Sequence, residues 1–208
     1  MAMFQNIANE LLEHGTSTLC EASELRCALD HALRPVWKGA ALAGAAYPVR
    51  CAPGDNLAIH IAMETVPAGY VLVIDASSHI AGYWGEVLTV AAQARSVVGL
   101  VIDGGVRDVD ALERRKFPVF ARGIGMRGTI KQAAPSVGES IVIGGVAISP
   151  GDLIVADSDG VLSLSAAHVD NTLEAARLRS TKEAAIMKHL EAGETTLEIL
   201  GLTAHRKR

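Results

Sequence analysis

Two apolar runs near the middle of the chain predict neighbouring strands of a covered sheet. Residues 71–74 (Val-Leu-Val-Ile) lead into Asp75, and residues 97–102 (Val-Val-Gly-Leu-Val-Ile) lead into Asp103. Runs of β-branched residues and leucine without polar alternation are typical of strands that are buried on both faces. Residues 86–95, between the two runs, have apolar side chains at 87, 88, 90, 91 and 94. This spacing predicts an amphipathic helix that packs on the sheet.

The alternation of strand and helix continues to residue 121. Residues 109–115 predict a short helix with Leu112 facing inward and residues 113–115 (Glu-Arg-Arg) facing outward. Residues 119–121 predict the strand that follows. Consecutive units of strand, helix and strand build a parallel sheet with right-handed connections.

The last third of the chain has a different character. Short β runs occupy residues 141–143, 153–155 and 161–164, with glycine-containing turns between them. Residues 166–191 then predict a long helix that ends before Gly193. Its polar middle, from 177 to 183, is expected to leave the core of its own chain. We therefore predict a single α/β domain over residues 1–208, flanked by N- and C-terminal helices.

Composition narrows the classes of function. Half of the residues are hydrophobic, only 4% are aromatic, and the net charge is −4. A mildly acidic chain with scattered Lys and Arg lacks the basic stripe of a nucleic-acid-binding surface. The apolar runs are far shorter than the roughly 20 residues that cross a bilayer. We expect no nucleic-acid partner and no membrane span.

The amino terminus and the cysteines suggest a cytoplasmic protein. Residues 1–12 include Glu10 and no basic residue, unlike a secretory leader or a transit peptide. The three cysteines form no C-x-x-C pair, and the seven histidines show no H-x-x-x-H spacing. Neither a disulfide framework nor an all-histidine metal site is expected.

One candidate binding segment enters the predicted helix at residue 86. Ligands of open α/β sheets bind beyond the carboxyl ends of the strands, where helix N-termini point their free N–H groups. Residues 82–88 read Gly-Tyr-Trp-Gly-Glu-Val-Leu. Gly85 allows close approach of the backbone, and the amides of Glu86, Val87 and Leu88 are first-turn donors without an intrahelical acceptor. They are suited to bind a carboxylate.

A second segment, residues 103–108, is expected at the same sheet edge. It places the guanidinium of Arg107 beside the carboxylate of Asp108. Each feature has a structural alternative, because Glu86 and Asp108 also suit helix starts and Asp103 before two glycines suits a turn. Their convergence predicts a site for a small oxo acid with a divalent ion. No G-x-G-x-x-G or Walker sequence occurs, which disfavours a nucleotide.

These stretches resemble the family of 4-hydroxy-4-methyl-2-oxoglutarate aldolases, which also includes the regulator of ribonuclease E activity. The resemblance rests on 82–86, 99–108 and 117–123, with support from 54–57, 155–161 and Lys182-Glu183. Two departures are Glu21-Ala22, where many members read Asp-Ala, and Glu86, where some aldolases have Asp. The longer side chain at 86 moves the carboxylate by about 1.5 Å, one C–C bond, so substrate choice is expected to differ.

The resemblance implies a swivelling β/β/α fold of the phosphohistidine-domain type, assembled as a homotrimer or as a hexamer of two trimers with sites at subunit interfaces. It also implies a class II carbon–carbon lyase that depends on Mg²⁺ or Mn²⁺. Such an enzyme cleaves 4-hydroxy-4-methyl-2-oxoglutarate or 4-carboxy-4-hydroxy-2-oxoadipate type substrates to pyruvate and decarboxylates oxaloacetate. The C-terminal helix, about 166–191, is expected to contact a neighbouring subunit.

The family's functional residues carry over to matching positions. Asp108 would anchor the metal, Arg107 would hold the keto or enolate oxygen, and the backbone of residues 85–88 would bind the pyruvyl carboxylate. Glu86 would position a metal-bound water, and Glu183 would arrive from the neighbouring subunit and act through water. Charge stabilisation agrees with this scheme, because both reactions build negative charge on an enolate oxygen. The Schiff-base route needs a desolvated lysine, and no lysine falls in an apolar strand.

Two other functions were weighed against the aldolase. The first is a non-enzymatic regulator that binds ribonuclease E or its RNA helicase partner through an acidic trimer surface, since the family includes proteins whose main role is binding. The second is a methyltransferase, a label attached to some relatives. It has little support, because no glycine-rich loop follows the first strong strand.

Overall fold

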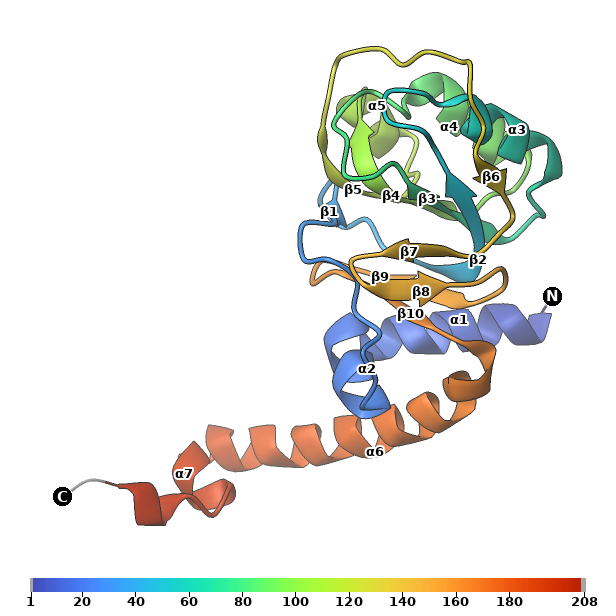
Figure 1. Cartoon of the computed structure of the whole chain (residues 1–208). Coiled ribbons are helices and arrows are strands. Elements are labelled where there is room, and N and C mark those ends of the chain that lie inside the picture. The colour runs from blue at the N-terminus through green and yellow to red at the C-terminus, as the bar shows by residue number, and fades with distance from the viewer. Residues whose placement is uncertain (1, 207–208) are drawn as a thin grey trace.

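The computed structural model describes residues 2–206, which form an eight-stranded sheet, a two-stranded sheet and flanking helices (Figure 1). The large sheet has the order β1-β5-β4-β3-β2-β9-β10, and β6 pairs with the end of β2. Strands β2 to β5 are mutually parallel, whereas β1, β6, β9 and β10 run antiparallel to their partners. This mixed α/β architecture confirms the predicted fold class.

The strands are β1 (Arg34–Pro35), β2 (Leu42–Arg50), β3 (Tyr70–Asp75), β4 (Gly99–Val106), β5 (Val119–Ile124), β6 (Ser136–Val137), β7 (Ile141–Ile143), β8 (Val146–Ile148), β9 (Leu153–Ala156) and β10 (Val161–Leu164). The helices are α1 (Ala2–His14), α2 (Thr16–Ser23), α3 (Leu57–Thr65), α4 (Glu86–Ala94), α5 (Val109–Arg114), α6 (Ala166–Glu191), α7 (Thr196–Ile199) and a short 3₁₀ helix, η1 (Thr203–His205). Among them, no helix combines the length and apolar character needed to cross a membrane.

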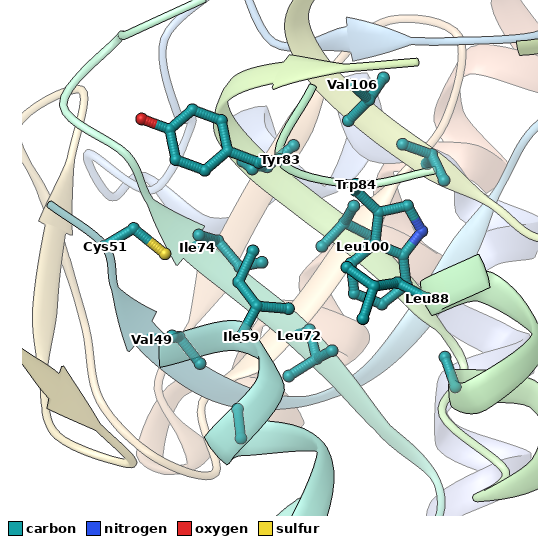
Figure 2. Close-up of a cluster of buried hydrophobic side chains, with 14 of the residues drawn as sticks. Val49, Cys51, Ile59, Leu72, Ile74, Tyr83, Trp84, Leu88, Leu100 and Val106 are labelled. Atoms are coloured by element: carbon teal, nitrogen blue, oxygen red, sulfur yellow. The ribbon is translucent and has the colours of Figure 1, made fainter. Parts of the chain in front are cut away.

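Helices α3, α4 and α5 cover one face of the parallel strands, and the main hydrophobic core lies beneath them (Figures 1 and 2). Tyr83 and Trp84 are fully buried there. The Trp84 ring stacks on Phe117, and its Nε1 donates to Thr89 at 2.8 Å. Burial of such large rings gives a major part of the stabilisation of this layer.

Two further clusters pack on the rest of the sheet. The β7–β8 hairpin covers the opposite face of the parallel strands, and α1, α2 and α6 enclose a third cluster with β9 and β10. Helix α6 has the predicted bounds, and its second half extends away from the body of the molecule (Figure 1). Leu178 and Met187 are 69% and 55% exposed on this projecting half, as expected for a helix that leaves its own core.

Several boundaries differ from the sequence-based expectation. The strand predicted to end at Asp103 continues to Val106, because Gly104 and Gly105 pack against Ala76 and Ala81 where a Cβ would clash at 2.8 and 2.5 Å. Strand β2, helix α3 and strand β8 were not predicted. The turns and remaining β runs after residue 140 agree closely with the structure.

Helix α4 is rotated about its axis relative to the prediction, so the face that packs on the sheet is not the predicted apolar face. Val87 is 81% exposed and Val90 is 44% exposed, whereas Leu88, Thr89 and Ala92 are buried. Thr89 tolerates burial because its hydroxyl donates to the Gly85 carbonyl at 3.1 Å and accepts from the Trp84 indole. The rotation leaves Val87 at the surface, beside the candidate site.

Candidate active site

A pocket of about 300 Å³ lies where the two predicted segments meet. Its walls come from the start of α3, the segment that leads into α4, the residues after β4, and the loop at 128–131. The lining residues include Gly82, Gly85, Val87, Leu88, Arg107 and Asp108. The sequence therefore predicted correctly that these two segments converge.

Asp108 joins the two segments directly. It has a left-handed backbone, with φ 61° and ψ 38°, which is uncommon for a residue other than glycine. Its Oδ2 accepts a hydrogen bond from the Glu86 amide at 3.0 Å. The prediction that this amide is free for a ligand is therefore wrong, whereas the Val87 and Leu88 amides, in the same first turn, have no acceptor within the helix.

The position of the Asp108 side chain requires a glycine at residue 85. A Cβ at position 85 would lie 2.3 Å from Asp108 Oδ2 and 3.1 Å from Arg107 Cγ. Position 82 is equally restricted, since a Cβ there would lie 2.8 Å from Arg107 Cδ. Both glycines thus make room for the charged pair, in addition to any close approach of a ligand.

Arg107 and Asp108 form a loose pair. Arg107 Nε lies 3.9 Å from Asp108 Oδ2, and the two side chains are 48% and 43% exposed. An ion pair this long and this hydrated gives little stability, so the guanidinium keeps most of its donors for another acceptor. The pair provides a cation and a carboxylate at the pocket wall.

Glu86 points away from the main pocket. Its Oε1 accepts from Arg115 Nε at 2.9 Å, and it lines an adjoining hollow of about 340 Å³ together with Asp108 and Asp110. Glu86, expected to bind the substrate, is therefore not part of the pocket lining, and it contributes to the wall of the neighbouring hollow instead.

Glu183 lies on the projecting half of α6, remote from this pocket in the same chain (Figure 1). Its Oε1 pairs with Arg179 Nε at 2.8 Å, and Arg179 also pairs with Glu21 on α2. Glu183 and Glu21, two carboxylates noted in different parts of the sequence, thus lie close together on one surface. The expectation that Glu183 serves a neighbouring subunit stays a prediction.

The donor set at this site suits only a largely hydrated metal ion. Among residues 2–206, no cluster of three or more His, Cys, Asp or Glu side chains could enclose a metal. Mg²⁺ and Mn²⁺ accept one or two carboxylates and retain several waters. Asp108, with Oδ2 engaged by the Glu86 amide and a side chain open to solvent, fits such an ion. A fully enclosed structural zinc site does not fit.

The sequence did not identify three polar residues of the pocket: Asn56, His60 and Lys131. Asp55 places Lys131 there, because its Oδ2 accepts from the amides of Gln132 and Ala133 at 2.7 and 2.8 Å. Burial raises the pKa of Asp55, but these amides and that of Leu57 outweigh it and hold the pKa below its ordinary value. Lys131 lies in a loop with an exposed side chain, and it also lines the pocket.

Asn56 and His60 lie one turn apart on α3. Asn56 is 5% exposed and donates from Nδ2 to the Tyr83 carbonyl at 3.0 Å. Its buried Oδ1 and the buried Nε2 of His60 have no hydrogen-bond partner among the residues that the structure describes. Burial, and then the charge of Lys131, lowers the pKa of His60 below its ordinary value of 6.5. The i, i+4 spacing of Asn56 and His60 is the sequence feature that could have placed the two side chains on one face of a helix.

Comparison with known proteins shows a match to one protein family and to a relative whose name fits that family. The family described as RraA-like, Aldolase/RraA, matches residues 16–163. A protein of Halalkalibacterium halodurans, named putative 4-hydroxy-4-methyl-2-oxoglutarate aldolase, is 32% identical over 171 residues, which are 82% of this chain and 81% of that protein.

Solved structures agree with this match. An uncharacterized protein from Pseudomonas syringae pv. tomato has a TM-score of 0.80 at 26% identity, covering 92% of this chain and 94% of that one. The RNA-processing inhibitor RraA from Thermus thermophilis has a TM-score of 0.66 at 26% identity, covering 72% of this chain and 92% of that one.

Proposed function

The chain belongs to the RraA-like family, and from this premise we propose that it is a divalent-metal-dependent aldolase. It cleaves 4-hydroxy-2-oxo diacids such as 4-hydroxy-4-methyl-2-oxoglutarate or 4-carboxy-4-hydroxy-2-oxoadipate to pyruvate, and it decarboxylates oxaloacetate. The observation that carries the proposal is the loosely paired Arg107 and Asp108 on the wall of a pocket that Val87 and Leu88, from the first turn of α4, also line.

The pyruvyl half of the substrate is assigned to the start of α4. Its carboxylate accepts from the Val87 and Leu88 amides, where the partial positive charge of a helix N-terminus favours an anion. Arg107 donates to the C2 oxygen, which becomes an enolate oxygen when the C3–C4 bond breaks. A charged donor at the position where negative charge develops lowers the barrier of both reactions.

Asp108 would hold Mg²⁺ or Mn²⁺, with Glu86 and a partner's Glu183 orienting water around that end of the pocket. When bound, the ion supplies a Lewis acid for the enolate charge. A homotrimer or a hexamer of two trimers would bring the second half of α6 to the pocket of the next copy. The exposed Leu178 and Met187 support an interface on that half.

A pyruvate-release assay tests the proposal. We expect turnover of oxaloacetate and of 4-hydroxy-4-methyl-2-oxoglutarate with Mg²⁺ or Mn²⁺, and its loss with EDTA. Borohydride added during turnover is the control for the other route, since it reduces a Schiff base to a stable adduct. Activity that survives EDTA and a pyruvate adduct on Lys131 would replace the metal proposal by a Schiff-base mechanism.

The competing proposal is a protein-binding regulator of ribonuclease E. The structurally similar protein from Thermus thermophilis is described as an RNA-processing inhibitor, which supports this alternative. A pull-down with ribonuclease E, run in parallel with the pyruvate assay, separates the two. Capture of the nuclease by a chain with no lyase activity would favour the regulator.

A further inference from the structure

The two proposed reactions differ in one chemical requirement. Aldol cleavage requires a base that removes the proton of the C4 hydroxyl group, whereas decarboxylation of oxaloacetate releases CO₂ without such a proton transfer. Both reactions then share the pyruvate enolate. A residue that acts only as the hydroxyl base would therefore affect one reaction and spare the other. The following inference rests on the proposed lyase function.

Few side chains on the pocket wall can act as this base. Arg107 and Lys131 are cations, and Asp108 is the proposed metal ligand. The Tyr83 hydroxyl contacts the Gly54 amide and His79 Nδ1, and burial raises its pKa, so it stays a phenol. Glu86 lies outside the pocket lining and is paired with Arg115.

His60 has the properties that a base needs. Its imidazole lines the pocket, and its buried Nε2 has no hydrogen-bond partner among the described residues. The polar groups that face it are Lys131 across the pocket and Asn56 one turn earlier on α3. Burial and the nearby ammonium both disfavour the imidazolium, so His60 is a neutral acceptor at pH 7.

We propose that His60 is the catalytic base for aldol cleavage in this chain. An imidazole nitrogen takes the C4 hydroxyl proton as the C4 carbonyl forms and the C3–C4 bond breaks. The electron pair of that bond becomes the enolate of pyruvate, with its charge beside Arg107. The imidazolium then returns the proton to C3, which gives the pyruvate methyl group and restores neutral His60.

The test compares both reactions in His60→Gln, with His31→Gln as a matched control. His31 is a surface residue with a 94% exposed side chain, outside the proposed machinery. For His60→Gln, we expect kcat of aldol cleavage to fall by about 100-fold or more, the usual contribution of a general base. We expect oxaloacetate decarboxylation to stay within about threefold of wild type, which also shows that the variant folds.

Two readouts separate a base from a merely structural histidine. Wild-type cleavage should lose activity only as the pH falls below about 6.5, following the lowered pKa of His60, and this limb should be absent in His60→Gln. In His60→Ala, added imidazole should restore cleavage in proportion to its neutral form.

The contrary outcomes are distinct. An equal fall of both activities, without rescue by imidazole, would overturn the proposal in favour of a structural role. Unchanged cleavage in His60→Gln would overturn it in favour of another base. A wild-type protein that performs neither reaction would instead refute the proposed function.

Discussion

Two clusters of arginine and aspartate lie near the carboxyl end of β4, and they differ in how completely their charges are paired. Arg122 on β5 donates to Asp103 on β4 and, at 2.8 Å, to Asp30, while Ser78 also donates to Asp103 at 3.1 Å. Asp103 is 7% exposed. Arg107 and Asp108, a few residues later, stand 3.9 Å apart and about half exposed.

The first cluster contains buried charges that are compensated within the fold, whereas the second contains charges that are exposed to solvent. A buried carboxylate is tolerated only when nearby donors compensate it, and Arg122 and Ser78 do so for Asp103. Arg107 and Asp108 need no such compensation, because water reaches both. Their side chains therefore remain accessible to the substrate and metal that we propose. This difference leads to opposite expectations for the same kind of substitution in the two clusters.

The largest effect is expected on catalysis at the loose pair. Arg107→Ala and Asp108→Ala should each lower kcat/KM for pyruvate release by about 1,000-fold, because each removes a charge that stabilises the enolate. Arg95→Ala, at the exposed C-terminal end of α4, serves as the control. Variants that keep wild-type turnover would show that the pair is not the site.

A smaller effect on the same site follows from Gly85. Gly85→Ala places a methyl group 2.3 Å from the present position of Asp108 Oδ2, so the carboxylate must move. We expect kcat/KM to fall by about 100-fold, since catalysis is sensitive to displacements of about 1 Å. Gly123→Ala, where the added Cβ meets only Ile80 Cδ1 at 3.4 Å, is the matched control. Equal activity of the two variants would argue that the position of Asp108 is unimportant.

The paired cluster should respond in stability. Arg122→Ala leaves the buried Asp103 without its cation, and we expect the free energy of unfolding to fall by about 3 kcal/mol. Arg107→Ala should change it by less than about 1 kcal/mol, because its pair is exposed. Urea denaturation followed by circular dichroism measures both. Similar losses in the two variants would remove the distinction between the clusters.

The smallest effect is a pH dependence of the paired cluster. The Ala32 amide and then Arg122 hold the pKa of Asp30 below its ordinary value of 3.8. The resulting stabilisation is present above pH 3.8 and is lost as the pH falls through the lowered pKa. Urea denaturation between pH 5 and pH 2.5 should show a smaller acid loss in Arg122→Ala than in wild type. Identical losses of unfolding free energy at low pH in the two proteins would show that the Asp30–Arg122 pair does not contribute to the acid dependence.

Much of the fold could be predicted where pattern and propensity agree. Strand β3 is a continuous apolar run, β10 is a short β run between glycine-containing turns, and α6 is a long helical stretch that ends before a glycine. Strand β2 is not evident from the sequence because it contains Gly44, Pro48 and three alanines, which have low strand propensity. It becomes a strand because β3 and β9 pair with its two edges, and these are long-range contacts.

Only the part of the site that comes from residues close together in the sequence could be predicted. Glycines beside Arg107 and Asp108 at a strand-to-helix junction are visible in the sequence. Lys131 is not, because it reaches the pocket through the carboxylate of Asp55, 76 residues earlier. Nor does the sequence show that the Glu86 amide is used by Asp108, since this depends on the left-handed backbone at Asp108.

Binding of oxalate, a planar dianion that resembles the pyruvate enolate, tests the central claim most directly. Titration calorimetry with Mg²⁺ should show oxalate binding to the wild-type protein and to Asp110→Asn, whose side chain lies in the adjoining hollow. Binding should disappear with EDTA and in Asp108→Asn. Oxalate that binds equally well without a divalent ion, or to Asp108→Asn, would contradict a metal-stabilised enolate at the Arg107 and Asp108 pair.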